Sequence, residues 1–315
     1  MLDVVAIGDC VVDLIVKVPS LPIKNEDVIT AESFTRQGGG MCNFLIMATR
    51  LGLKTGVIDR LGTDDHGKFI SNIFKKEGID TSHLIYMNEE NTTNVIVIVD
   101  NRGQHAFIGI LGSGTKLSEP DIDEEYIKNS RSLYTCGYTL FSQSSLRATL
   151  KAFSIANKYN ILTFFDPGPA VYVVSRKVLH EIIEKHVDFL ILNSDELKAL
   201  TNIENIKDAC RKVAAGRCEN VIIKMGAEGC ITFTHREFNE IPGFRVKVVD
   251  TTGAGDTFNA AFIYGILRGL SMREAAIIAN AAGAAKVQKL GAGANVPRRE
   301  DIQRILDKNR IKIIV

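Results

Sequence analysis

The chain has 315 residues, 45% hydrophobic and 24% charged, which is ordinary for a soluble globular protein with one large α/β domain or two smaller ones. A formal net charge of +1, no Trp and no dense Lys/Arg cluster argue against nucleic acid as a partner. No run approaches the roughly 18 apolar residues of a membrane-spanning helix, so we expect no membrane partner either.

The N-terminal residues begin as a strand and lack the basic start of a signal peptide. The six cysteines form no Cys-x-x-Cys pair, and the six histidines form no zinc-binding motif. In a chain of this length the cysteines are typical of reduced thiols, so we expect a cytoplasmic protein without a dedicated zinc site.

Apolar strand-like runs alternate with segments of helical period along most of the chain. In chain order, strands are expected at 4–8, 55–59, 132–135, 161–165, 189–192, 221–224 and 245–249. Helices are expected at 41–51, 64–76, 144–158, 175–185, 194–215 and from about 254 to 267. This alternation predicts an α/β fold with a doubly wound, mostly parallel sheet and helices on both faces. No linker divides the chain, so residues 1–315 are expected to form one domain.

Two regions interrupt the alternation, because pairs of strand-like runs follow each other without a helix. These runs cover 11–18, 28–34, 93–99 and 105–111. They predict a small antiparallel sheet, built from about 11–36 and 92–112 and inserted in the domain. A lid over a substrate is the functional interpretation; a plain surface excursion or a dimer contact is the alternative, and a lid that pairs between subunits would be both.

The run Asp250-Thr251-Thr252-Gly253-Ala254-Gly255-Asp256 is the most specific motif in the chain. It lies between an expected strand and an expected helix, where glycines leave backbone N–H groups uncovered at the positive end of the helix dipole. Such a turn binds phosphate. Asp256 beside an anion site suits a base that accepts a proton next to a phosphoryl group. The plainer interpretation is a tight turn followed by an ordinary first-turn carboxylate.

Polar residues elsewhere suggest a site for a small polyhydroxyl ligand. Gly38, Gly39 and Gly40 open the first expected core helix and permit close approach of a ligand, and Asn43 offers both a donor and an acceptor. The alternative is a flexible loop with a capping Asn. Asp13 is the only charge in an apolar strand, so it is either a surface residue or an acceptor for sugar hydroxyls.

Two further groups follow expected core strands, at the strand ends where doubly wound sheets bind ligands. Asn193 and Glu196 would orient the water shell of a Mg²⁺ ion, unless Ser194 is simply an N-cap followed by acidic residues. The turn Lys224–Gly229 has glycines that let a nucleotide lie against the backbone; otherwise it is an ordinary hairpin turn into 230–234.

Together these residues resemble the PfkB carbohydrate kinase family, that of ribokinase and fructokinase, in order and over essentially the whole chain. The resemblance implies a ribokinase-like fold and ATP-dependent phosphorylation of a primary hydroxyl of a small sugar or sugar acid. It implies that Asp256 is the catalytic base, with the N–H groups of Gly253, Ala254 and Gly255 as the anion hole. It also implies a homodimer formed through the lid.

The resemblance assigns the remaining site residues as well. The sugar would be held by Asp13, Gly39, Gly40 and Asn43. ATP and Mg²⁺ would be bound by Asn193, Glu196 (through water), Lys224, Gly226, Gly229, Gly255 and, at the adenine pocket, Asn280. A monovalent cation such as K⁺ would be bound by Asp250, Thr252, Gly291 and Asn295.

The chain departs from the family's common forms around the substrate, which leaves the substrate open. Gly40-Met41 replaces the Lys and Gly of the ribokinase signature, and Asp166–Pro169 lacks the Asn and Arg of the common fructokinase form. One alternative is a nucleoside kinase of the same family, in which Phe34 or Phe107 stacks on a base. A non-catalytic sugar-binding regulator is the other. A nicotinamide dehydrogenase is disfavoured because Gly8-Asp9-Cys10 follows the first strand in place of Gly-x-Gly-x-x-Gly.

Overall fold

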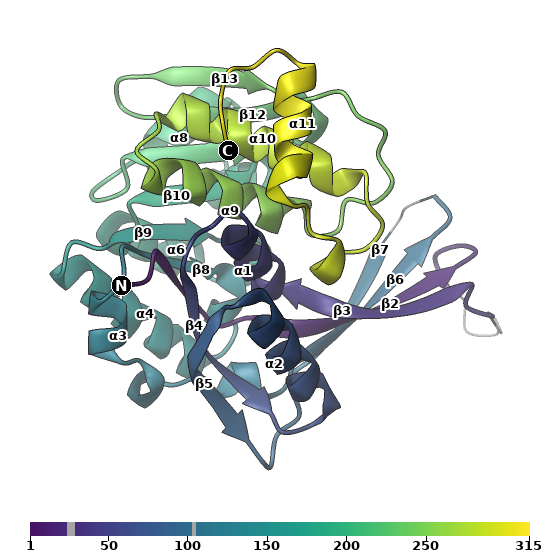
Figure 1. The fold of residues 1–315 in the computed structure, drawn as a ribbon. Coiled ribbons are helices and arrows are strands. Elements are labelled where there is room, and N and C mark those ends of the chain that lie inside the picture. The colour runs from purple at the N-terminus through teal and green to yellow at the C-terminus, as the bar shows by residue number, and fades with distance from the viewer. Residues whose placement is uncertain (24–28, 103–104) are drawn as a thin grey trace.

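The computed structural model of the protein describes residues 1–23, 29–102 and 105–315. The predicted doubly wound α/β fold is confirmed: a large sheet lies between helices, and a smaller sheet projects from one side (Figure 1). The order of the large sheet is β13-β12-β11-β10-β9-β8-β1-β4-β5. Its strands are β1 (Val4–Ile7), β4 (Thr55–Gly62), β5 (Asp80–Met87), β8 (Ser132–Cys136), β9 (Leu162–Asp166), β10 (Phe189–Asn193), β11 (Asn220–Lys224), β12 (Gly229–Phe233) and β13 (Phe238–Pro242).

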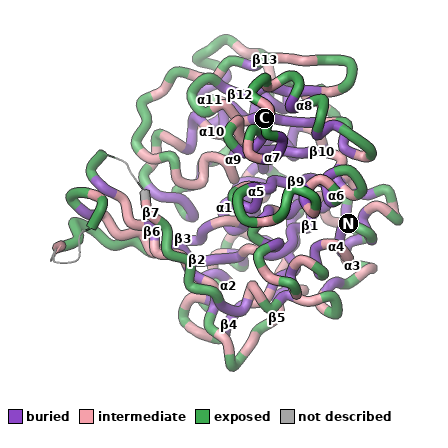
Figure 2. Tube along the Cα trace, turned by 180° about the vertical axis from the view of Figure 1, so that it is seen from behind, coloured by how far each residue is buried: buried purple, intermediate pink, exposed green. Residues whose placement is uncertain are grey.

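Neighbouring strands are parallel from β5 through to β11, and the β11–β12 and β12–β13 pairs are antiparallel. Alternate residues of a strand point to opposite faces of the sheet. In β1, Val4 and Ala6 therefore pack into one hydrophobic cluster, and Val5 and Ile7 into another. The two faces of the sheet thus carry separate cores, and Figure 2 shows the central strands as buried.

Each core is closed by its own helix layer. The first layer consists of α1 (Met41–Arg50), α2 (Asp65–Glu77), α9 (Ala254–Leu267), α10 (Met272–Val287) and α11 (Arg299–Lys308). The second consists of α3 (Glu124–Lys128), α4 (Gln143–Lys158), α5 (Ala170–Val173), α6 (Arg176–His186), α7 (Ser194–Thr201) and α8 (Ile206–Val213).

The smaller sheet, here called the lid sheet, has the order β3-β2-β6-β7. Its strands are β2 (Cys10–Val18), β3 (Ser33–Gly40), β6 (Asn94–Asp100) and β7 (His105–Ile110). Both of its outer pairs are antiparallel, as predicted, and its central β2–β6 pair is parallel. Figure 1 shows the lid sheet extending away from the body of the molecule.

Two strand predictions need correction. The expected strand at 28–34 begins at residue 28, which lies outside the described residues, and β3 itself runs from Ser33 to Gly40. The glycine run is therefore the end of a strand and not a loop. The alternation at 245–249 produces no strand in the described chain: Val248 and Val249 are exposed, and the amides of Val249 and Asp250 donate to the carbonyl of Val287. Backbone hydrogen bonds thus join this segment to the end of α10 and not to a strand.

Among the described residues, no helix is long and apolar enough to cross a membrane. All six cysteines are free thiols, and five of them are buried.

Candidate active site

The turn Asp250–Asp256 leads into α9, and Gly253 is the N-cap residue of this helix. Gly253 has a φ of 75°, in the left-handed region that glycine tolerates best. Within the described residues, the amides of Gly253 and Gly255 form no hydrogen bond. The amide of Ala254 differs from the prediction, because the tight turn directs it onto the carbonyl of Thr251 at 3.1 Å. Two of the three predicted amides are thus free to bind an anion at the helix N-terminus.

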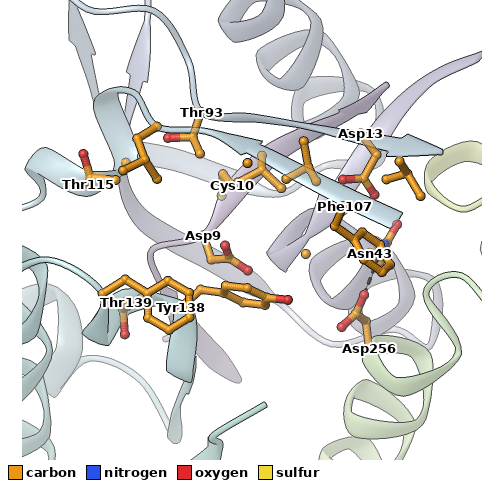
Figure 3. Close-up of a pocket in the computed structure, with 18 of the residues that line it drawn as sticks. Asp9, Cys10, Asp13, Asn43, Thr93, Phe107, Thr115, Tyr138, Thr139 and Asp256 are labelled. Atoms are coloured by element: carbon orange, nitrogen blue, oxygen red, sulfur yellow. Dashed lines mark hydrogen bonds between the residues drawn. The ribbon is translucent and has the colours of Figure 1, made fainter. Parts of the chain in front are cut away.

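Asp256 lies in the first turn of α9 and faces a cavity beneath the lid sheet (Figure 3). Its carboxylate accepts a hydrogen bond from Nδ2 of Asn43 at 3.1 Å. Burial raises the pKa of Asp256 to about 6, although the Asn43 hydrogen bond and the charge of Lys224 act in the opposite direction. The carboxylate is therefore ionised at neutral pH and still basic enough to accept a proton from a hydroxyl group.

Asp13 reaches the same cavity from β2. It is only 9% exposed, so the surface alternative is wrong. Burial, followed by the negative charge of Asp256, raises its pKa to about 7. Gly39 lies beside it on β3, and a Cβ atom at Gly39 would overlap the carboxylate of Asp13. The glycine is therefore needed for Asp13 to point into the cavity.

Asn43 connects α1 to the start of α9 and to the Gly293 segment. Its Oδ1 accepts from the amide of Gly293 at 2.8 Å, while its Nδ2 donates to Asp256. The N-cap of α1 is Gly40, and no side chain caps this helix. The capping alternative for Asn43 is therefore wrong.

Asp9 is a carboxylate of this cavity that the sequence reasoning missed. It has a φ of 64°, which is unusual for a residue with a side chain. Sγ of Cys136 donates to its Oδ2 at 3.2 Å. Burial raises the pKa of Asp9 well above its usual value, and the charges of Asp59, Asp256 and Asp13 add to this effect. Its position after a core strand is the one sequence signal that could have identified it.

The cavity has a volume of about 580 Å³, a size typical of small-molecule sites. Its polar wall carries Asp9, Asp13 and Asp256, whereas Phe107, Tyr138 and Phe141 contribute aromatic surface. Figure 3 shows Asp9 and Tyr138 on the wall opposite β6 and β7 of the lid sheet. Among the described residues, no Lys, Arg or His side chain lines this cavity.

A smaller cavity of about 180 Å³ adjoins the first, and Asp9, Gly40 and Asp256 line both. On its far side Nζ of Lys224 donates to Asp166 at 2.6 Å. A Cβ on Gly255 would lie 3.6 Å from this Nζ, so the ammonium group is next to a free amide of the helix N-terminus.

Asp166 and Asn259 are further residues of the small cavity region that the sequence reasoning did not assign to the site. Nδ2 of Asn259 donates to Asp166 at 2.6 Å and to the hydroxyl of Tyr134 at 3.0 Å. Asp166 is the last residue of β9, at the carboxyl end of this strand, and Asn259 is three residues after Asp256 on one face of α9. Both positions are signals that could have identified them.

Asn193 and Glu196 form a reciprocal capping box at the start of α7. Oδ1 of Asn193 accepts from the amide of Glu196, and Oε2 of Glu196 accepts from the amide of Asn193, both at 2.8 Å. The N-cap is Asn193 and not Ser194. Glu196 also lines the small cavity, where burial and then the charge of Asp166 raise its pKa.

Of the residues predicted to bind ATP and Mg²⁺, Glu196, Lys224 and Gly255 line the small cavity. The others, which are Asn193, Gly226, Gly229 and Asn280, line neither cavity. The turn from Gly226 to Gly229 connects β11 to the antiparallel β12, as the hairpin alternative proposed, and there is open space beside Gly226. Nδ2 of Asn280 donates to the carbonyls of Ile241 and Pro242, which attaches α10 to the end of β13.

Asp250 is one of the four residues predicted to bind a monovalent cation, and two of the others, Thr252 and Gly291, bond to its carboxylate. Its Oδ1 accepts from the amide and the hydroxyl of Thr252 at 2.9 and 2.8 Å, and its Oδ2 accepts from the amide of Gly291 at 2.7 Å. Nδ2 of Asn295 donates to the carbonyl of Leu290 at 2.7 Å. Protein donors thus occupy both oxygens of the carboxylate.

The chain is similar to known proteins over nearly its whole length. The chain is 29% identical over 309 residues to ribokinase of Haemophilus influenzae, covering 96% of this chain and 97% of that one. It is 27% identical over 320 residues to 5-dehydro-2-deoxygluconokinase 2 of Bacillus cereus, covering 97% and 95%. Ribokinase of Arabidopsis thaliana, solved with ribose and ATP, superposes with a TM-score of 0.81 at 25% identity, covering 97% and 98%.

The model of the pfkB carbohydrate kinase family matches residues 1–299. This match spans both sheets, the glycine run of β3 and the turn that leads into α9. The chain therefore belongs to the pfkB family of carbohydrate kinases.

Proposed function

We propose that the protein transfers the γ-phosphoryl group of ATP to a primary hydroxyl of a small uncharged sugar, with Asp256 as the base. One observation supports this proposal above all: Asp9, Asp13 and Asp256 face one cavity in which the described residues place no basic side chain. Hydroxyl groups can donate to these carboxylates, and a base is available at the start of α9 for the hydroxyl that reacts.

The charge of the cavity favours an uncharged substrate over a sugar acid. The pKa values of Asp13 and Asp256 are already raised, to about 7 and about 6, by burial. A substrate carboxylate would add negative charge to this low-dielectric site, and like charges there repel each other strongly. An acid substrate would need a cation, which the described lining of the cavity lacks.

Residues where the two cavities meet at the start of α9 suit the phosphate end of ATP. Lys224 and the free amides of Gly253 and Gly255 offer positive charge and donors, so they would hold the phosphoryl group as it moves. The described residues include no group of three or more His, Cys, Asp or Glu that could hold a metal ion. Asp166 and Glu196 nevertheless fit a Mg²⁺ ion, because this ion usually keeps several waters and binds one or two carboxylates plus phosphate oxygens. When bound, Mg²⁺ would offset the charge of the phosphates.

The remaining steps belong to the chain's own residues. Asn43 orients Asp256 through its Nδ2, and Asp13 with Gly39 positions the sugar against the lid sheet. Asp256 accepts the proton of the hydroxyl as its oxygen bonds to the γ-phosphorus and the bond to the leaving ADP oxygen breaks. The lid sheet would exclude water from the site, so that the phosphoryl group is transferred to the sugar and not to water.

A nucleoside is the second candidate substrate, because aromatic side chains flank the same cavity. Phe107 of β7 lies on the lid side, and the Tyr138 and Phe141 rings pack edge to face with centroids 5.4 Å apart. Phe34, the other predicted stacking residue, is exposed and does not line the cavity.

A substrate panel scored by ADP release tests the proposal. It should contain neutral sugars, inositols, nucleosides and sugar acids such as gluconate. We expect the best neutral substrate to exceed every acid by at least about tenfold in kcat/KM, since a buried unpaired charge costs several kcal/mol. A sugar acid as the best substrate would contradict the uncharged-substrate proposal, and no ADP release with any compound would favour the non-catalytic regulator.

The outer face of the lid sheet supports a homodimer. Residues 11, 13, 95, 97 and 107 line the cavity, so the alternate residues face the other way. Ile108 and Ile110 of that outer face are 51% and 43% exposed, and Ile96 and Ile98 are partly buried beside them. A second copy of the chain would cover this apolar surface. The free thiols suit a reducing compartment such as the cytoplasm.

A further inference from the structure

Lys286 is a buried cation behind the glycine turn. It lies in the last turn of α10, and its exposed fraction is 0%. Lysine is almost never fully buried unless a partner compensates its charge. In the described chain, its Nζ donates one hydrogen bond, to the carbonyl of Lys289 at 3.3 Å, and it forms no ion pair within 4.0 Å. The ammonium group therefore has donors left over.

Its backbone neighbours hold it against the segment that leads into the turn. The carbonyl of Val287 accepts from the amides of Val249 and Asp250, at 2.7 and 3.1 Å. Burial lowers the pKa of Lys286, and the charge of Lys289 adds to this, whereas the negative charges of Asp250 and Asp256 act in the opposite direction. The end of α10 that carries Lys286 is thus bonded to the start of the Asp250–Asp256 turn, and the two carboxylates of this turn are the negative charges that Lys286 meets.

The residues around Asp250 do not fit a separate monovalent cation. The carboxylate already accepts three hydrogen bonds, from Thr252 and Gly291. Asn295 directs its amide group to the carbonyl of Leu290. The carbonyl of Lys289 accepts from Lys286 itself. With Lys286 in place, donors of the chain thus occupy these oxygens and a positive charge is already present. Removing Lys286 would free the carbonyl of Lys289, and the carboxylate, with about four acceptor positions, keeps one for a cation.

We propose that the ammonium group of Lys286 takes the place of a monovalent cation in this protein. It supplies a fixed positive charge behind the turn that carries Asp256 and the free amides of Gly253 and Gly255. Preorganised charge of this kind stabilises an anion without reorganisation during the reaction. Turnover is consequently independent of K⁺. The effect on ADP release rests on the proposed kinase reaction, whereas the effect on the unfolding midpoint does not.

The test compares the natural protein with Lys286→Ala in choline chloride and in KCl, both at about 0.1 M ionic strength. We expect ADP release and the unfolding midpoint of the natural protein to be the same in the two salts, within twofold for the rate. Lys286→Ala should lose at least about tenfold in turnover in choline chloride and regain most of it in KCl. Its unfolding midpoint should also rise in KCl, because an ion that binds only the folded state stabilises it.

Lys289→Ala is the matched control, since it removes the same charge three residues away. Its side chain is 36% exposed and pairs with Asp301 at 2.5 Å. We expect this variant to remain insensitive to the choice of salt. If Lys286→Ala does not fold in choline chloride, Lys286→Met, which keeps the volume without the charge, should still lose turnover there.

Several outcomes would overturn the proposal. These are a natural protein that K⁺ stimulates tenfold, a Lys286→Ala or Lys286→Met variant of normal turnover in choline chloride, and a folded Lys286→Ala variant that K⁺ neither stabilises nor reactivates. Absence of ADP release from the natural protein with every substrate would contradict the kinase reaction instead, and the unfolding midpoints would still test Lys286.

Discussion

Asp256 is held where its basicity increases without loss of access to the cavity. Burial raises its pKa, whereas Asn43 and Lys224 limit the shift to about 6. For the proposed role as a base, a lower value would weaken Asp256, and a higher value would leave it protonated at neutral pH. The neighbouring residues therefore decide how well this carboxylate can accept a proton.

Replacing Asp256 by Asn should lower kcat by about 10² or more, because the amide cannot accept the proton. The base is active when ionised, so kcat of the natural protein should fall as the pH drops below about 6. This acidic limb should be absent from the variant. ADP release from pH 5 to 8 measures both effects. Asp65→Asn, which changes an exposed first-turn carboxylate of α2, is the control and should match the natural protein. Near-normal turnover of Asp256→Asn would remove the base role.

Asp13 should lower stability at neutral pH. Its pKa is about 7 in the folded protein, against 3.8 ordinarily, so the folded state binds more protons than the unfolded state between these values. Its contribution to stability is therefore fully present below about pH 4 and is lost as the pH rises through 7. As the pH rises from 4 to 8, the free energy of unfolding of Asp13→Asn should increase relative to that of the natural protein, by up to roughly 4 kcal/mol. Urea unfolding at several pH values measures this difference; an equal difference at every pH would contradict it.

At the scale of the elements, the close packing of α9 against α10 supports the site, because α9 carries Asp256 and α10 carries Lys286. Gly265 allows this approach. A Cβ atom at Gly265 would lie 2.6 Å from Cβ of Ala275 and 2.7 Å from its Cα. Since one of these atoms is backbone, the two helices would have to separate.

Gly265→Ala should therefore lower the free energy of unfolding by about 1–3 kcal/mol, as overpacking does. Gly283→Ala makes the same change on α10, where the nearest atom would be 4.0 Å away. Without a clash, this control should keep or raise stability, by about 0.4–1 kcal/mol, because alanine restricts the unfolded chain. Urea unfolding of both variants would test the helix contact, and equal stabilities would contradict it.

Two segments show that a local sequence pattern does not always predict a strand. The pattern does not predict β5 (Asp80–Met87), because its polar residues leave no apolar run. The strand forms because it pairs in parallel with the edge of β4. Arg245–Val249 shows the reverse, because this alternating segment forms no strand and bonds to the end of α10 instead. Strand pairing depends on a neighbour that a local pattern does not reveal.

At the scale of the whole molecule, the lid sheet extends from the body, and its outer face is unusually apolar for an exposed surface. If two copies pair through this face, the lid of each is stabilised by the other. The closure of the cavity then depends on the oligomer.

Ile108→Asp should convert the expected dimer to a monomer, because it places a charge in the apolar interface. Light scattering coupled to size-exclusion chromatography measures the mass directly. Ile314→Asp is the matched control, since Ile314 is 85% exposed and lies outside the lid sheet. A natural protein that is monomeric, or an Ile108→Asp variant that stays dimeric, would contradict an interface through the lid.

The sequence by itself determined what depends on local order. Alternating strands and helices specified the doubly wound fold, and the run from Asp250 to Asp256 specified a turn with free amides and an acid at a helix start. Only the tertiary structure decided which distant groups share one environment. It brought Asp9 and Asp13 to Asp256, showed that the amide of Ala254 is occupied, and buried Lys286 behind the turn. The physical reason is that burial and neighbouring charge set the behaviour of a titratable group, and both arise from chain segments far apart in the sequence.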